Sequence, residues 1–192
     1  MANKKTLKVQ FKKLTKNAVI PSYAHPGEDV GMDVTVTSVR YDELLDEYVY
    51  GTGLACASDF LMSLFAHPRS SNHKHNYYLT NSVGIVDTKG YRGELMVIYK
   101  HRDSLDTRLN NAALAEYDDL SWYKKIQPGA LGKIKARLKE QFLADPIQYA
   151  PYQVGDRAFQ IWGQQITPIE PIEVTKLPKS KRGTGGFGST GK

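Results

Sequence analysis

Residues 81–100, NSVGIVDTKGYRGELMVIYK, constrain the fold more than any other part of the chain. Two apolar segments, around Ile85 and over residues 95–98, flank the turn-forming residues 87–90. This pattern predicts two strands joined in a β-hairpin. Near its open end, a hairpin exposes backbone N–H and C=O groups, with which a flat ligand can pair as if with a base.

The polar residues of this stretch form a candidate catalytic site. Asp87 stands where the first predicted strand ends, and Tyr91 and Arg92 stand where the second begins. A carboxylate, an aromatic ring and a cation would then lie together on a rigid scaffold. The alternative is an ordinary surface hairpin with solvated charges, and the other segments must decide between the two.

Other short segments have the pattern of strands. Apolar and polar residues alternate over residues 7–11, and a β-branched segment carries Asp33. Residues 41–50 are ambiguous, because acidic residues stand among the apolar ones. Further strands are expected over residues 51–57, 60–66 and 154–162, with 166–174 as an edge strand or an extended arm. This number of short strands predicts an all-β sandwich or barrel.

Residues 101–152 differ in character and are interpreted as a partly helical insertion. Helices are predicted over residues 104–117 and 131–143, the second ended by Pro146. The helices are thus confined to the inserted segment, and residues 1–192 are expected to form a single domain.

The composition bounds the possible partners. One cysteine, Cys56, gives no internal disulfide, and no apolar run reaches the roughly 18 residues that span a membrane, so a soluble, cytoplasmic protein is expected. The net charge of +6 favours an anionic partner, although basic ends can also serve solubility. Binding to nucleic acid is disfavoured, because the cations gather at the two ends without interleaved aromatic residues.

The C-terminal arm, residues 176–192, is too rich in glycine, serine and lysine to fold alone. Its glycines allow backbone N–H groups to face phosphate oxygens, and Arg182, Ser189 and Thr190 add charge and donors. Phe187 is a lone aromatic residue that can stack on a flat ring. Phosphate and ring together indicate a nucleotide, whereas the alternative is a disordered linker.

A second phosphate-binding cluster is expected at Arg69, Ser70 and Ser71, where a guanidinium stands beside two hydroxyls. Nearby, His73 and His75 are a weak candidate for a metal site, and polar surface histidines are the alternative.

Together, five segments resemble, in order, the five motifs of the trimeric dUTP pyrophosphatases (dUTPases). The matching segments are GMDV at residues 31–34, PRSS at 68–71, NSVGIVDTKGYRGE at 81–94, GDRAFQ at 155–160 and RGTGGFGSTG at 182–191. The resemblance implies a jelly-roll-like β barrel, assembled as a homotrimer with sites at the subunit interfaces.

The resemblance also implies a role for each site residue. Asp87 would activate the water that attacks the α-phosphorus of dUTP, and pyrophosphate would leave. Mg²⁺ would bridge the triphosphate, with Asp33 nearby and acting through water. The implied substrate-binding residues are Asn81, Gly84, Ile85, Val86, Tyr91 and Met96 for the nucleoside, and Arg69, Ser70, Ser71, Gln160, Arg182, Phe187, Gly188, Ser189 and Thr190 for the phosphates and the closing arm.

Such an enzyme would keep uracil out of DNA and supply dUMP for thymidylate synthesis in a bacterium or a phage-infected cell. The sequence departs from the family pattern by one extra residue, Gly90, before Tyr91, by Phe159 in the fourth motif, and by the long insertion. Insertions of this kind suggest a phage origin. With Trp122 and Tyr123 expected to be exposed, the insertion is a hypothetical docking surface for a regulatory protein.

Two other functions are considered. A dCTP deaminase of the same fold needs a catalytic glutamate in the hairpin region, where this chain has Asp87. A nucleotide-sensing regulator would bind dUTP and release a partner, with hydrolysis secondary or lost.

Overall fold

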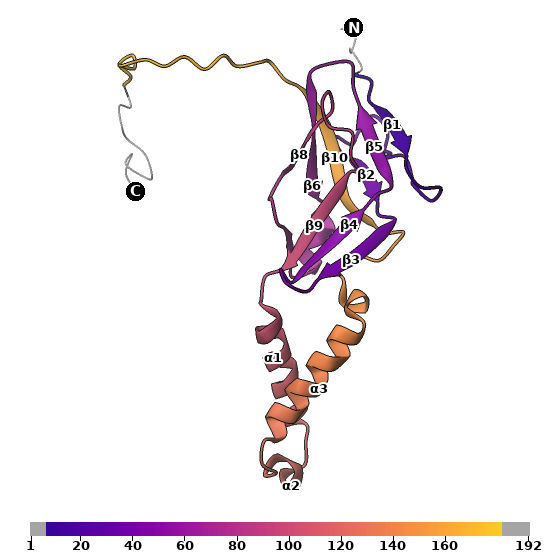
Figure 1. Cartoon of the computed structure of the whole chain (residues 1–192), viewed down its shortest axis with the longest axis vertical. Coiled ribbons are helices and arrows are strands. Elements are labelled where there is room, and N and C mark those ends of the chain that lie inside the picture. The colour runs from indigo at the N-terminus through magenta and orange to yellow at the C-terminus, as the bar shows by residue number, and fades with distance from the viewer. Residues whose placement is uncertain (1–6, 182–192) are drawn as a thin grey trace.

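The structure, a computed structural model, describes residues 7–181, which fold into a β body with a helical projection (Figure 1). The strands of this region are β1 (Gln10–Lys13), β2 (Met32–Thr35), β3 (Ser38–Asp42), β4 (Glu47–Gly51), β5 (Leu54–Ala57), β6 (Met62–Pro68), β7 (Tyr77–Leu79), β8 (Gly84–Asp87), β9 (Met96–His101) and β10 (Arg157–Gln165). Its helices are η1 (Ser70–Lys74), α1 (Leu105–Asp118), α2 (Trp122–Lys125), α3 (Ala130–Ala144) and η2 (Pro146–Tyr149), where η marks a 3-10 helix.

Two antiparallel four-stranded sheets, in the orders β2-β10-β6-β8 and β3-β4-β9-β7, form most of the body. The strands β1 and β5 add a two-stranded sheet. Side chains alternate between the faces of a strand, so Phe159 and Ile161 of β10 enter the core with Leu64 and Ala66 of β6. The predicted all-β, jelly-roll-like body is therefore confirmed, and Phe159 is a core residue.

Tyrosine supplies an unusual share of this core. The side chains of Tyr48, Tyr50 and Tyr99 are buried almost completely. A buried hydroxyl needs a hydrogen-bond partner. The Tyr99 hydroxyl donates to the carbonyl of Ala158 at 3.0 Å, and that of Tyr48 donates to the carbonyl of Pro146 at 2.9 Å. Tyr99 thus joins β9 to β10, and Tyr48 joins β4 to the segment that returns from the helices.

The predicted hairpin over residues 81–100 is wrong in its pairing. Two strands form, but β8 pairs with β6, whereas β9 pairs with β4 and β7 in the other sheet. The connection between them is pinned at Thr88, which is fully buried and whose hydroxyl donates to the carbonyl of Met62 at 2.7 Å. Because the chain crosses from one sheet to the other here, the two strands diverge.

Three other segments are clarified by the structure. The ambiguous residues 41–50 belong to the hairpin of β3 and β4, whose turn contains Asp46 with a φ of 54°. The first strand begins at Gln10, later than the alternation from residue 7 indicates. Residues 166–174 form no strand and run as an extended arm away from the body (Figure 1).

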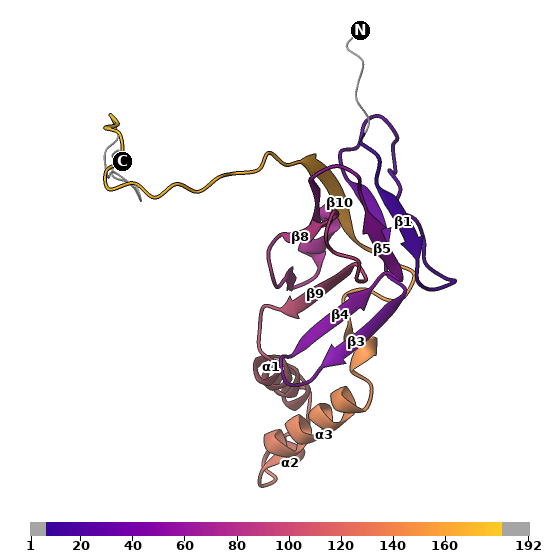
Figure 2. The same cartoon turned by 45° about the horizontal axis from the view of Figure 1, so that its top comes forward.

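The helices α1 and α3 occupy the two segments where helices were predicted, and they project from one end of the body (Figures 1 and 2). Ser104 caps α1, because its hydroxyl accepts the N–H of Thr107 at 3.2 Å. At the root of the projection, the Asp46 carboxylate accepts from the Arg108 guanidinium and from the N–H of Leu105. The guanidinium also lies 5.4 Å from the ring centre of Phe142 on α3, so both helices are fixed to the β3–β4 turn.

Candidate active site

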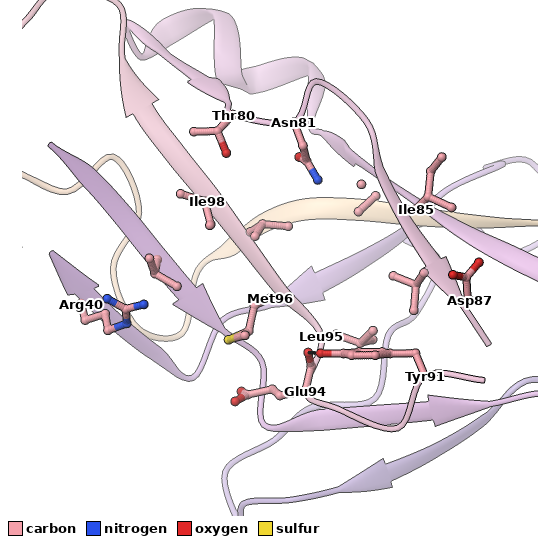
Figure 3. A pocket seen from close by; sticks show the side chains of 15 residues that line it. Arg40, Thr80, Asn81, Ile85, Asp87, Tyr91, Glu94, Leu95, Met96 and Ile98 are labelled. Atoms are coloured by element: carbon pink, nitrogen blue, oxygen red, sulfur yellow. Dashed lines mark hydrogen bonds between the residues drawn. The ribbon is translucent and has the colours of Figure 1, made fainter. Parts of the chain in front are cut away.

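The divergence of β8 and β9 opens a pocket of about 420 Å³. It collects the residues that the sequence assigns to nucleoside binding and catalysis, and Figure 3 shows Asn81, Asp87 and Tyr91 around the gap between the strands. Those lining residues are Asn81, Gly84, Ile85, Val86, Asp87, Tyr91 and Met96.

Two strand edges face this pocket. In the described part of the chain β8 pairs only with β6, so its other edge is unpaired. Strand β7 covers β9 only over residues 99–101, and beyond it the N–H of Thr80 donates to the carbonyl of Ile98 at 3.0 Å. Unpaired strand edges carry rows of N–H and C=O groups. The pocket can therefore bind a flat polar ring through the backbone.

Asp87 is the last residue of β8 and lies at the pocket wall. Its backbone carbonyl accepts the N–H groups of Gly90 and Tyr91 at 3.1 and 2.8 Å, which fixes the turn. Within residues 7–181, its exposed carboxylate forms no hydrogen bond and no ion pair. The carboxylate is thus free to accept a proton from a water molecule.

Tyr91 is held against its own turn. Its hydroxyl donates to the carbonyl of Glu94 at 3.0 Å, and a Cβ at Gly93 would lie 2.3 Å from that hydroxyl, so only glycine fits there. A Cβ at Gly90 would meet nothing. Gly90, the extra residue relative to the family pattern, therefore faces open space. Tyr91 still lines the pocket together with Asp87.

The sequence predicts that Asp87, Tyr91 and Arg92 lie together at the site, and this prediction is wrong for Arg92. The Arg92 guanidinium donates to the carbonyls of Thr88, Lys89 and Tyr91 at 2.8–2.9 Å. It closes the turn instead of facing the pocket. A turn this long leaves several carbonyls unpaired, and a guanidinium satisfies three of them at once.

A second hollow, also of about 420 Å³, contains other predicted residues. Asp33, Arg69, Ser70 and Gln160 line it, together with the loop before β2. Gln160 is paired in register with Asp33 on one side and with His67 on the other, which places these residues on one face of the sheet. A Cβ at Gly31 would lie 2.9 Å from Oε1 of Gln160, so this glycine leaves room for the amide.

The Asp33 carboxylate lies between two arginines. Nε of Arg69 donates to Oδ1 at 2.8 Å, and Nη1 of Arg157 donates to Oδ2 at 3.0 Å. The Asp33 side chain is only 13% exposed, as expected for a site-facing carboxylate. The Asp33 carboxylate therefore orients the Arg69 side chain at the edge of the hollow, and it also holds Arg157.

Not all the predicted residues come together. Ser71 lies in η1 but does not line the hollow. His73 and His75 do not share a metal site: the His73 ring bonds the carbonyl of Ser70, the His75 ring packs on Tyr152, and no metal-binding group of three was found in the described residues. The predicted arm residues Arg182, Phe187, Gly188, Ser189 and Thr190 lie outside the described residues.

Among the lining residues of the first pocket that were not predicted from the sequence, two are charged. Arg40 reaches it from β3, and Glu94 precedes β9. Arg40 is distant in sequence, and only the pairing of β3 with β4 and of β4 with β9 brings it near. The Glu94 carboxylate accepts the N–H of Gly53 at 2.6 Å, so its role is structural.

Comparison with solved structures defines the class of the protein. A point mutant of the dUTPase of Staphylococcus bacteriophage 80alpha, solved with dUpNHpp, matches with a TM-score of 0.63 at 20% identity over 97% of this chain and 100% of that one. The dUTPase of phage phi11 of S. aureus, described with a species-specific insert, matches with a TM-score of 0.55 at 18% identity over 88% and 97%. The chain is an all-β protein with the dUTPase fold.

Sequence comparison gives the family. No family model matches the chain. It is 31% identical over 193 residues to the deoxyuridine 5'-triphosphate nucleotidohydrolase of Wolinella succinogenes, covering 100% of this chain and 99% of that one. The enzyme of the same name from Streptomyces griseus is 29% identical over 184 residues, covering 95% and 80%. The chain belongs to the dUTPase family, the dUTP diphosphatases.

Proposed function

We propose that the chain hydrolyses dUTP to dUMP and pyrophosphate with Asp87 as the general base. The observation that carries this proposal is the free carboxylate of Asp87 at the wall of the pocket. There it accepts a proton from the water that attacks the α-phosphorus. The turn bonds to its backbone carbonyl fix the backbone from which this side chain extends.

The nucleoside binds between the diverging strands. The unpaired edge of β8, at Gly84, Ile85 and Val86, and the edge of β9 at Met96 read the donor and acceptor groups of uracil. Asn81 supports the base from the side, since its Nδ2 lies 3.5 Å from the Cβ position of Gly84. Tyr91 packs on the deoxyribose and excludes a ribose hydroxyl.

The phosphates bind to the second hollow of another copy. Arg69, Ser70 and Gln160, which line this hollow, are the proposed ligands, together with Ser71, which follows Ser70 in η1. A guanidinium with adjacent hydroxyls suits a triphosphate. A homotrimer supplies three such shared sites. In this proposal residues 1–192 form one catalytic domain, and the arm at 176–192 closes over the substrate with Arg182, Phe187, Gly188, Ser189 and Thr190.

Mg²⁺ is the proposed metal, and a related dUTPase from phage phi11 is described with a structural Mg(II) ion. The described residues contain no group of three His, Cys, Asp or Glu that could hold an ion. In this proposal Mg²⁺ would bind together with the triphosphate, and Asp33 would act only through water because both its carboxylate oxygens are bonded to arginines. When bound, Mg²⁺ neutralises phosphate charge.

The direct test is pyrophosphate release from dUTP, dCTP, dTTP and UTP, for the wild type and for Asp87→Asn. We expect release from dUTP alone and its loss in Asp87→Asn, with dUTP binding retained because the amide has the same shape. Tight binding without turnover in the wild type would instead favour the sensor. The activity would keep uracil out of DNA and provide dUMP for thymidylate synthesis.

A second role, as a docking arm for a regulatory protein, is proposed for the inserted segment. The support is the exposure of Trp122 and Tyr123 at the helical tip, 74% and 62%, with Ile126 at 63%. The phage 80alpha dUTPase is described as controlling transfer of virulence genes. A photo-crosslinking residue at position 123 should capture a discrete host or phage protein that the same residue at exposed Tyr23 does not. Equal labelling at both positions would argue against docking.

No helix in the described residues is long and apolar enough to cross a membrane.

A further inference from the structure

The 3-10 helix η1 presents Ser70 and Ser71, and Arg69 directly precedes it. None of the residues of η1 is buried, and no side chain caps its N-terminus. Burial therefore does not fix this turn, and its position depends on its hydrogen bonds.

Asn72, within η1, makes most of these bonds. Its N–H donates to the carbonyl of Arg69 at 2.9 Å, and its Nδ2 donates to the carbonyl of Tyr77 at 3.0 Å. Its Oδ1 accepts the hydroxyl of Tyr152 at 3.0 Å. One amide thus joins the turn to β7 on one side and to Tyr152 on the other.

Tyr152 is the last residue of the inserted segment and is 5% exposed. Its ring packs against Tyr50 and Tyr99, with centroids 6.1 and 5.3 Å apart. Its N–H donates to the hydroxyl of Tyr50 at 3.3 Å. Burial raises the pKa of the Tyr152 hydroxyl, which therefore keeps its proton and remains a donor. Tyr152 is a rigid anchor in the core.

The segment that returns from the helices also contacts β7 directly. The Tyr77 hydroxyl donates to the carbonyl of Tyr149 at 3.2 Å, while the Tyr77 carbonyl accepts from Asn72. The segment that returns from the helices and the turn at Arg69 are therefore neighbours in one hydrogen-bond network. The sequence gives no sign of this, because 80 residues separate Asn72 from Tyr152.

We propose that Tyr152 is a positioning residue for the triphosphate, because its hydroxyl fixes Asn72 and so the turn that carries Arg69, Ser70 and Ser71. This inference rests on the proposed role of those three residues as phosphate ligands. The Tyr152 hydroxyl is then the hydrogen-bond donor by which the inserted segment reaches the turn that carries the phosphate ligands.

The test is Tyr152→Phe, which removes one oxygen and keeps the packed ring. We expect the Kd of the imido analogue dUpNHpp to rise about three- to tenfold, the usual effect of one lost hydrogen bond. The KM for dUTP should rise with it. The Kd of deoxyuridine, which has no phosphate and binds between β8 and β9, should not change. Equal weakening of both ligands would show a merely structural role and overturn the inference.

Two further variants make the outcome decisive. Tyr48→Phe removes a hydroxyl from the same tyrosine cluster, one that donates to the carbonyl of Pro146 and not to η1, and it should leave both affinities unchanged. Arg69→Gln tests the phosphate site itself. Weaker dUpNHpp binding by Arg69→Gln but not by Tyr152→Phe would overturn the role of Tyr152 alone. Unchanged binding in both would overturn the proposed phosphate site.

A double variant tests the path through Asn72. If Tyr152 acts through that amide, Tyr152→Phe should add little to the effect of Asn72→Ala on dUpNHpp binding. Fully additive effects would show that Tyr152 acts by another route and would overturn the inference.

Discussion

Asp87 and Arg69 lie at opposite ends of β6. Asp87 is opposite Ser63, near the start of that strand, and Arg69 follows its last residue, Pro68. Six residues of extended chain separate the two positions, about 20 Å at the usual rise per residue of a strand. This separation supports the proposed function, in which a complete site combines Asp87 of one copy with Arg69 of another.

Two inactive variants should therefore restore each other. Asp87→Asn and Arg69→Ala should each abolish hydrolysis alone, but mixed trimers should contain sites with Asp87 from one copy and Arg69 from its neighbour. If subunits mix randomly at equal amounts, about a quarter of the sites regain both residues. The measurement is dUTP hydrolysis after co-refolding the two proteins.

A mixture of Asp87→Asn with Asp87→Ala is the matched control, because no arrangement of those copies supplies the carboxylate. Activity that stays at background in the first mixture, although mixed trimers form, would mean that each site is built by one copy.

Removing the Asp33 charge should loosen the second hollow. Asp33→Asn leaves Arg69 and Arg157 without the carboxylate that both bond. Hydrogen bonds to a charged, largely buried group contribute about 1.5–3 kcal/mol, so we expect a fall of that size in the free energy of unfolding and weaker dUpNHpp binding. Urea unfolding and calorimetry measure the two effects.

The control for this prediction is Glu116→Gln on the projection. Glu116 pairs with Arg137, but both side chains are more than 40% exposed, so its loss should cost less than about 1 kcal/mol. Equal losses of unfolding free energy in Asp33→Asn and Glu116→Gln would show that the bonds of Asp33 to its two arginines are worth no more than a surface ion pair.

The pH dependence of stability should include a contribution from His101, where β9 leads into the projection. Burial lowers the pKa of His101, and its Nδ1 accepts the N–H of Asp103 at 2.9 Å in the neutral form. The unfolded state then binds the proton more readily than the folded state. The stabilisation is therefore complete above the unfolded pKa of about 6.5 and is lost as the pH falls through the lower folded value.

Unfolding midpoints in urea at pH 7.5 and 5.5 measure this effect. His101→Asn should be less stable than the wild type at pH 7.5, and the difference should shrink at pH 5.5. A difference that is the same at both values would exclude His101 as the titrating group.

The sequence predicts the local structure of this protein well where a segment determines its own conformation. Both long helices form where the sequence predicts them, and the second follows from its apolar spacing and from Pro146 at its end. The local sequence does not predict that β8 and β9 join different sheets. This crossing depends on buried Thr88, whose hydroxyl donates to the carbonyl of Met62, 26 residues earlier.

The site shows the same limit. Motif resemblance identifies Asp87, Asp33, Arg69 and Gln160, and the structure places them in two hollows. Their separation depends on strand register, which no local pattern determines. The roles of Asn72 and Arg157 also depend on partners that are distant in the chain.

Shortening the helical projection should spare hydrolysis as long as its root is kept. The root consists of Asp46, Arg108 and Phe142, which join the β3–β4 turn to both helices. Replacing residues 113–134 with a short Gly-Ser linker removes the exposed Trp122 and Tyr123 and leaves these contacts intact. We expect unchanged kcat and KM for dUTP, because neither hollow includes a residue of the projection. A deletion that also removes Arg108 and Phe142 should unfold, since it leaves the partly buried Asp46 carboxylate without its cation. If the short deletion already lowers kcat, with circular dichroism showing the β body intact, the tip itself contributes to catalysis and is more than a docking arm.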